Sequence, residues 1–123
     1  MYSKKVLQHG MKPKNVGEIK DASGVGEVGN LRCGDILKLY IKVKNGRITK
    51  ICFKTFGCVA AIASSDALCE LAKGKTIKDA KKITNKDIIN YLGGNMPAVK
   101  VHCSVLGQNA LKKAIEDYEK KFK

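Results

Sequence analysis

The sequence lacks several features that would place it in a specialised class of protein. It contains no tryptophan, and no apolar run among its 123 residues reaches the length of a membrane span. Residues 1–10 carry only scattered apolar side chains, so they lack the hydrophobic stretch of a secretory signal. We therefore expect a soluble, intracellular protein of the cytoplasm that folds as one domain over residues 1–123.

Arginine is also scarce, which bears on the net charge of +13. Only Arg32 and Arg47 are arginines, and the other basic residues are lysines. Bidentate recognition of bases and phosphates favours arginine, and the few aromatic residues do not alternate with basic ones as in a stacking surface. We interpret the lysines chiefly as solvated side chains, with docking of an acidic protein as the alternative and nucleic-acid binding as the least favoured hypothesis.

The cysteines are odd in number and widely spread. They are Cys33, Cys52, Cys58, Cys69 and Cys103. A small secreted disulfide scaffold would show an even and denser set, and these spacings match no local zinc-finger pattern such as C-x-x-C. Free thiols, metal ligands or a catalytic thiol in a reducing compartment are better interpretations.

Alternation of apolar and polar residues predicts a β-hairpin over residues 35–56. An Asn-Gly dipeptide at its centre marks the turn. A two-residue loop there would bring lysines into the core, so we predict a three-residue loop such as Lys44–Gly46. Ile51 and Phe53 then share the buried face, and Cys52 lies on the opposite face with lysines.

The remaining segments are helices and one glycine-rich strand, whose glycines indicate mobility or a close backbone approach. We predict a helix at residues 3–9, an irregular strand at 24–34, and helices at 59–73, 77–82, 86–92 and from 102 or 103 to about 121. The last helix carries an apolar stripe of helical period. This order predicts an α+β fold, a short three-stranded antiparallel sheet with helices packed on one face.

Three cysteines lie in settings that suit a reactive or metal-binding thiol. Cys58 and Cys103 each open a predicted helix, where the helix dipole favours the thiolate, and Cys103 follows His102 directly. Cys33 begins a turn-like segment that ends at Asp35. Three thiolates with an imidazole or carboxylate form a ligand set for a soft metal or an iron–sulfur cluster. A sulfur transferase that uses Cys103 as nucleophile and His102 as base, and a structural zinc domain, are the alternatives.

The other two cysteines are interpreted as structural. Cys69 shares one helix face with Ile62, seven residues earlier, and is predicted to fill the core. Cys52 is predicted to be an inert thiol.

Several segments, in order along nearly the whole chain, carry a resemblance to a known family. They are Pro13–Gly17, Cys33–Asp35, Phe53–Cys58 followed by Ala60–Ser65, Lys73–Lys75 and Met96–Ser104. With these motifs the chain resembles the iron–sulfur cluster assembly scaffolds called IscU or NifU N-terminal domain.

The resemblance implies a scaffold rather than an enzyme. Cys33, Cys58 and Cys103 would be the scaffold cysteines, with His102 or Asp35 as the fourth ligand and Cys103 as the sulfur acceptor. A [2Fe–2S] cluster would be built there from iron and from the persulfide sulfur of a cysteine desulfurase, and then passed to acceptor proteins. Zinc would bind at the same site.

The resemblance also implies partners. They are a cysteine desulfurase and iron–sulfur acceptor proteins, with frataxin-like or ferredoxin partners and a homodimer as further expectations, and without membrane or nucleic acid. Relatives served by a dedicated Hsp70-type chaperone carry Leu-Pro-Pro-Val-Lys before the His-Cys pair, whereas Met96–Lys100 has Ala98 in place of the second proline. Loss of this proline removes part of the stiff extended geometry, so we expect weak recognition by such a chaperone.

Overall fold

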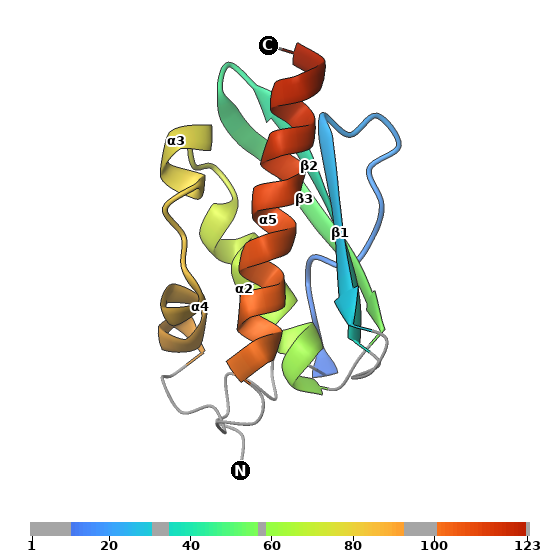
Figure 1. Cartoon of the computed structure of the whole chain (residues 1–123), viewed down its shortest axis with the longest axis vertical. Helices are drawn as coiled ribbons and strands as arrows, with labels where there is room; N and C mark the ends of the chain where they lie inside the picture. The colour runs from blue at the N-terminus through green and yellow to red at the C-terminus, as the bar shows by residue number, and fades with distance from the viewer. Residues whose placement is uncertain (1–10, 31–34, 57–58, 93–100, 123) are drawn as a thin grey trace.

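The fold has two layers, a three-stranded antiparallel sheet and a layer of helices on one of its faces (Figure 1). The computed structural model describes residues 11–30, 35–56, 59–92 and 101–122. The sheet order is β1 (Gly24–Asn30), β2 (Asp35–Lys44), β3 (Arg47–Phe56). The helices in this part of the chain are α2 (Val59–Ala72), α3 (Ile77–Ala80), α4 (Asn85–Tyr91) and α5 (Val101–Phe122). The expected α+β class is confirmed.

The β2–β3 hairpin differs from the prediction at its loop. Asn45 and Gly46 alone form the turn, with φ of 53° and 74°, as in a type I′ turn. The three-residue loop is therefore wrong. A bulge at Thr49 supplies the extra residue instead and shifts the register by one. Phe53 consequently lies on the buried face and Cys52 on the opposite face, as predicted.

The core lies between the inner face of the sheet and the helices. Every second residue of β2 and β3 points into it, which is the pleat of a sheet with one covered face. The fully or nearly fully buried apolar side chains include Leu37, Leu39, Ile41, Ile51 and Phe53 from the sheet, Ala67 and Leu68 from α2, Ile88 from α4, and Ala110, Leu111, Ala114 and Ile115 from α5. The apolar stripe predicted for the last helix is confirmed along its centre.

Helix α5 lies directly against the backbone of β1 because two strand residues have no side chain. A Cβ built on Gly24 would lie 2.1 Å from the carbonyl oxygen of Ala114, and one on Gly26 would lie 2.2 Å from that of Ala110. These contacts confirm the close approach and show that α5 runs antiparallel to β1. The N-terminal end of α5 therefore lies beside the C-terminal end of β1 (Figure 1).

The remaining elements begin and end close to the predicted positions. Helix α2 is followed by Gly74, whose φ is 84°. Thr76 caps α3, which is two residues shorter than predicted, and Thr84 caps α4 with a complete capping box. The predicted helix at residues 3–9 and the end of the predicted first strand, residues 31–34, lie outside the described residues.

Candidate functional site

One end of the sheet gathers the elements that flank the predicted ligands. Asn30 at the end of β1 pairs with Asp35 at the start of β2, and Ile36 pairs with Phe56 at the end of β3. Helix α2 begins three residues after Phe56, and the N-terminal end of α5 reaches the same end of the molecule (Figure 1). Three parts of the chain that are far apart in sequence, around residues 30–36, 56–59 and 101, therefore meet there.

The five predicted ligands belong to this end of the molecule by their positions in the chain. Asp35 is the first residue of β2, and His102 and Cys103 lie in the first turn of α5. Cys33 belongs to segment 31–34, between β1 and β2, and Cys58 to segment 57–58, between β3 and α2. Both segments lie outside the described residues, and so do the side chains of Asp35, His102 and Cys103. The ligand set itself stays a prediction.

No competing metal site exists among the side chains that the structure describes. Within that set, no group of three or more histidine, cysteine, aspartate or glutamate residues is arranged to hold a metal ion.

Of the two described cysteines, Cys69 fills the core as predicted, and the inertness of Cys52 stays a prediction. Cys69 is completely buried in the core, and burial, reinforced by the nearby carboxylate of Asp66, raises the pKa of its thiol well above the ordinary value. Such a thiol forms little thiolate and reacts slowly. Cys52 is a partly exposed free thiol on the outer face of β3. Cys52 lies four residues before the end of β3, and Cys69 lies in the C-terminal half of α2, so both are set back from the converging ends of these elements.

The buried carboxylate of Asp66 was not predicted from the sequence. This side chain is fully buried in α2, and its Oδ1 atom accepts hydrogen bonds from the backbone amides of Lys14 (2.9 Å) and Asn15 (3.0 Å) and from the Asn15 side-chain amide (2.9 Å). Asn15 belongs to the Pro13–Gly17 motif, which was singled out only through the family resemblance. An aspartate within a helix of small residues was the available signal.

The outer face of the sheet carries cross-strand lysine pairs. Lys38 lies opposite Lys54, and Lys42 lies opposite Lys50, which brings like charges together on one face. The segment that crosses this face supplies Glu18 to Lys54 and Asp21 to Lys42. Hydrogen bonds and the positive charge of these lysines lower the pKa of both carboxyl groups. Half of the lysines in these pairs are therefore neutralised within the chain.

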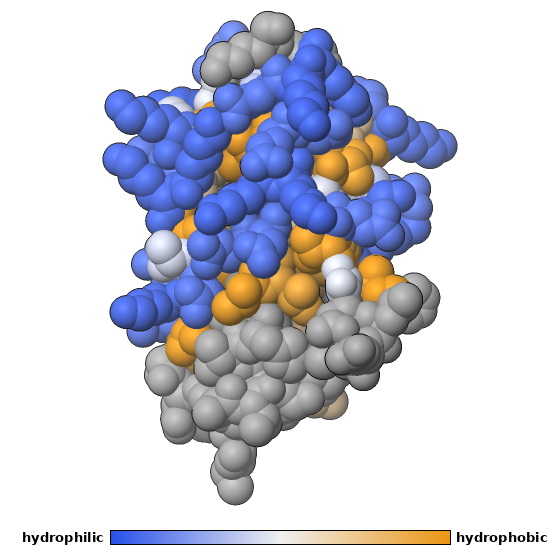
Figure 2. Space-filling model, viewed as in Figure 1, coloured by the Kyte–Doolittle hydropathy of each residue, from blue (hydrophilic) through white to orange (hydrophobic). Residues whose placement is uncertain are grey.

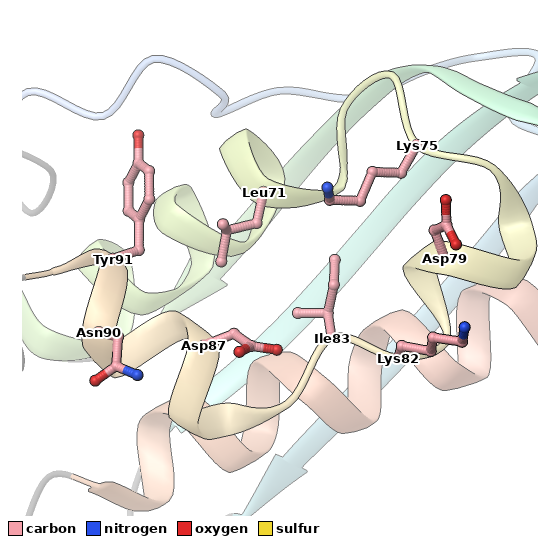
Figure 3. A pocket seen from close by; sticks show the side chains of 8 residues that line it. All are labelled: Leu71, Lys75, Asp79, Lys82, Ile83, Asp87, Asn90 and Tyr91. Carbon is pink, nitrogen blue, oxygen red and sulfur yellow. The ribbon is translucent and has the colours of Figure 1, made fainter.

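A concave region lies away from the converging strand ends. It is a groove of about 490 Å³ between the C-terminal half of α2 and helices α3 and α4 (Figure 3). Leu71, Ile83 and Tyr91 give it an apolar wall, and charged side chains of both signs stand at its rim. Its described lining holds no cysteine or histidine, so this groove offers no ligands for the predicted thiol chemistry.

The visible helical face is mostly polar. Figure 2 shows hydrophilic side chains over most of this face, with apolar surface in gaps and next to the residues drawn in grey. Val105, one turn into α5, is 39% exposed. No helix among the described residues is long and apolar enough to cross a membrane.

The fold defines a small α+β protein in which the ends of three strands and the starts of two helices meet at one end of a three-stranded sheet. The chain matches the family described as "NifU-like N terminal domain" over residues 1–123. The iron–sulfur cluster assembly scaffold protein IscU 1 of Archaeoglobus fulgidus is 55% identical over 121 residues, which cover 98% of this chain and 78% of that protein. The scaffold protein IscU of Buchnera aphidicola subsp. Baizongia pistaciae is 51% identical over 126 residues, which cover 99% of this chain and 98% of that protein. This chain belongs to the NifU-like N-terminal domain family.

Solved structures agree with the fold. A proposed iron–sulfur cluster assembly scaffold protein for the SUF system from Fervidobacterium islandicum superposes with a TM-score of 0.79 at 27% identity, covering 93% of this chain and 96% of that chain. The N-terminal part of a NifU-like protein from Brucella abortus superposes with a TM-score of 0.77 at 18% identity, covering 97% and 94%. The second likeness shows that the fold is shared.

Proposed function

We propose that this protein is a scaffold, and not an enzyme, on which a labile [2Fe–2S] cluster is assembled and then transferred to acceptor proteins. The observation that carries the proposal is the meeting of β1, β2, β3, α2 and α5 at one end of the sheet, because the predicted ligands stand at or between these elements. Relatives 51–55% identical to the chain are scaffold proteins of iron–sulfur cluster assembly.

The proposed ligands combine soft and exchangeable donors. Cys33, Cys58 and Cys103 supply thiolates, which suit iron and zinc. His102 or Asp35 supplies the fourth position. An imidazole nitrogen or a carboxylate oxygen is a harder donor than thiolate and can be protonated, so the cargo is held less firmly than by four cysteines. A scaffold must release its cluster, and this donor set suits release.

Sulfur would arrive through Cys103. Its thiolate attacks the outer sulfur of a desulfurase persulfide, a new S–S bond forms, and the desulfurase thiolate leaves. Conversion of this sulfur to bridging sulfide takes up two electrons, for which we propose a ferredoxin-like partner. A frataxin-like partner, a cytoplasmic location and weak use of an Hsp70-type chaperone, because of Ala98, complete the proposal.

Anaerobic reconstitution with iron, cysteine and a cysteine desulfurase tests this function. We expect visible absorption from about one cluster per monomer or dimer. Changing Cys33, Cys58 or Cys103 to serine should abolish or strongly weaken it. Cys52→Ser is the matched control and should assemble the cluster normally, because Cys52 lies on the outer face of β3.

Two outcomes would contradict the scaffold. The first is a failure to bind iron or sulfur when the wild-type thiols are reduced. The second is multiple turnover of sulfur without metal that depends on Cys103 alone, since this would indicate a sulfur transferase with His102 as base.

A further inference from the structure

The segment Lys14–Gly17 forms a brace between β3 and α2. On the strand side, the Phe53 amide donates to the Asn15 carbonyl oxygen, and the Gly17 amide donates to the Phe53 carbonyl oxygen, both at 2.9 Å. The segment thus runs parallel to β3 along the edge that β2 leaves open. Asn15 is 8% exposed and Phe53 1% exposed, so these bonds are shielded from water.

On the helix side, the brace ends on a buried negative charge. Oδ1 of Asp66 accepts from two successive backbone amides and from the Asn15 side chain. The same side-chain amide lies 3.4 Å from Glu70, one turn further along α2. Burying a carboxylate is costly unless hydrogen bonds replace its hydration, and charge-assisted bonds are among the strongest in proteins. The Asn15–Asp66 contact is therefore a strong link between the brace and α2.

The brace ties together the strand that precedes Cys58 in the sequence and the helix that follows it. Phe53 lies three residues before Phe56, the last residue of β3, which is about 10 Å along a strand. Asp66 lies seven residues after Val59, the first residue of α2, which is about 10 Å along a helix. The two elements are thus tied together at similar distances from the two-residue connection 57–58.

We propose that Asn15 and Asp66 are positioning residues for the proposed cluster site, because they hold β3 and α2 in a fixed relation on either side of the connection that carries Cys58. This inference rests on the function proposed above. It also gives the Pro13–Gly17 motif a role, since Asn15 is the residue of that motif which joins strand to helix.

Covering the open edge of β3 does not by itself explain the arrangement. The two backbone hydrogen bonds to Phe53 already pair the open edge at that residue, and they require no particular side chain at position 15. The hydrogen bonds to Asp66 do not pair any backbone group of β3. What they add is a tie between the segment and α2.

Alkylation of the metal-free, reduced protein tests the proposal at the level of individual thiols. The rates at Cys33, Cys58 and Cys103 are measured by mass mapping in the wild type, in Asn15→Ala and in Asp66→Asn. Cys69, which is buried in the core, reports global opening in the same samples. The matched control is Ser23→Ala, which removes another shielded side-chain acceptor, for the Val43 amide (2.9 Å), near the opposite end of the sheet.

We expect Asn15→Ala to raise the alkylation rate of Cys58 about fivefold, because the loss of one hydrogen bond makes local opening easier. The alkylation rates of Cys33 and Cys103 should change by less than about twofold. Asp66→Asn keeps an acceptor oxygen and should show a smaller change in the same direction. Ser23→Ala should leave the ratio of the Cys58 rate to the other rates unchanged.

Equal acceleration of all three cysteines, or an unchanged Cys58 rate in Asn15→Ala, would overturn the proposal and leave the brace a purely structural feature. The readout uses no metal, so it remains informative if cluster assembly fails in the wild type. Normal assembly by the wild type with no selective effect at Cys58 would reject the positioning role while leaving the scaffold function intact.

Discussion

The absence of a side chain at Gly26 lets α5 pack directly against the backbone of β1. We predict that Gly26→Ala destabilises the protein by about 2–3 kcal/mol, because the new Cβ would lie 2.2 Å from a backbone oxygen of α5, which cannot rotate away. Urea unfolding at neutral pH measures the difference. The shift of α5 should also broaden amide signals along β1 in NMR spectra.

Gly107 provides the contrasting control within α5. A Cβ there would meet its nearest neighbour, Leu68 Cδ2, at 3.4 Å, close to ordinary contact. Alanine also favours helical backbone over glycine, so Gly107→Ala should stabilise the protein by about 0.5–1 kcal/mol. Equal destabilisation by both substitutions would show that close packing against β1 is not the cause.

The carboxylate of Asp117 makes stability depend on pH. It accepts a hydrogen bond from the Val25 amide and pairs with Lys121, and these contacts lower its pKa. A carboxyl group with a lowered folded pKa stabilises the fold above its unfolded pKa and loses this effect as pH falls through the folded pKa. We therefore expect Asp117→Asn to be less stable than the wild type at pH 7 and to lose less stability on acidification below about pH 4.

Unfolding titrations between pH 7 and pH 2 measure this dependence. Glu116→Gln, the change at the preceding exposed carboxylate of α5, is the control. Identical pH profiles for the two variants would rule out a specific contribution from the Val25 contact.

At the scale of elements, α4 depends on its N-terminal cap. The Thr84 side chain accepts from the Asp87 amide while the Asp87 side chain accepts from the Thr84 amide, and the helix buries Ile88. Thr84→Ala should cost about 1 kcal/mol, and amide exchange in α4 should accelerate more than elsewhere. Thr84→Ser keeps the acceptor oxygen and should remain near the wild type. Uniform acceleration along the chain would contradict a local cap effect.

The β2–β3 hairpin shows which part of an element can be predicted. The alternation of apolar and polar residues identified the buried face correctly. A slip of the register by one residue would bury lysines in the core, which costs too much free energy. It did not identify the loop. A bulge and a longer loop both restore the same alternation, and the difference depends on the backbone conformation of Asn45, Gly46 and Thr49, which the apolar pattern does not contain.

At the scale of the whole molecule, apolar side chains hold the described core together. The buried cluster of the described residues joins the sheet to α2, α4 and α5 through apolar side chains, with Cys69 as its only thiol in that part of the chain. We therefore expect chelation of bound zinc or iron to leave cooperative thermal unfolding in place, with a lowered midpoint because ligand binding to the native state is lost.

Circular dichroism during a thermal scan, with and without chelator, measures this. Zinc readdition should restore the original midpoint. Loss of the unfolding transition on chelation would instead support a structural zinc domain.

The candidate site was predicted less completely than the fold. Local settings at helix starts and turns, together with the family resemblance, singled out Cys33, Cys58 and Cys103 and set Cys52 and Cys69 aside. Asp66 escaped notice because its partners lie more than 50 residues away in the chain. A buried charge becomes recognisable only when the groups that surround it are known.

The sequence by itself determined the elements, the buried face of the sheet and the family, since periodicity, caps and motifs are local properties of the chain. The tertiary structure decided which elements and side chains lie next to one another. It brought the ends of three strands and the starts of two helices to one end of the sheet, and it joined Asn15 to Asp66 between β3 and α2. These relations depend on the approach of α5 to glycines of β1 and on a buried hydrogen-bonded carboxylate, and both are long-range contacts that no local pattern encodes.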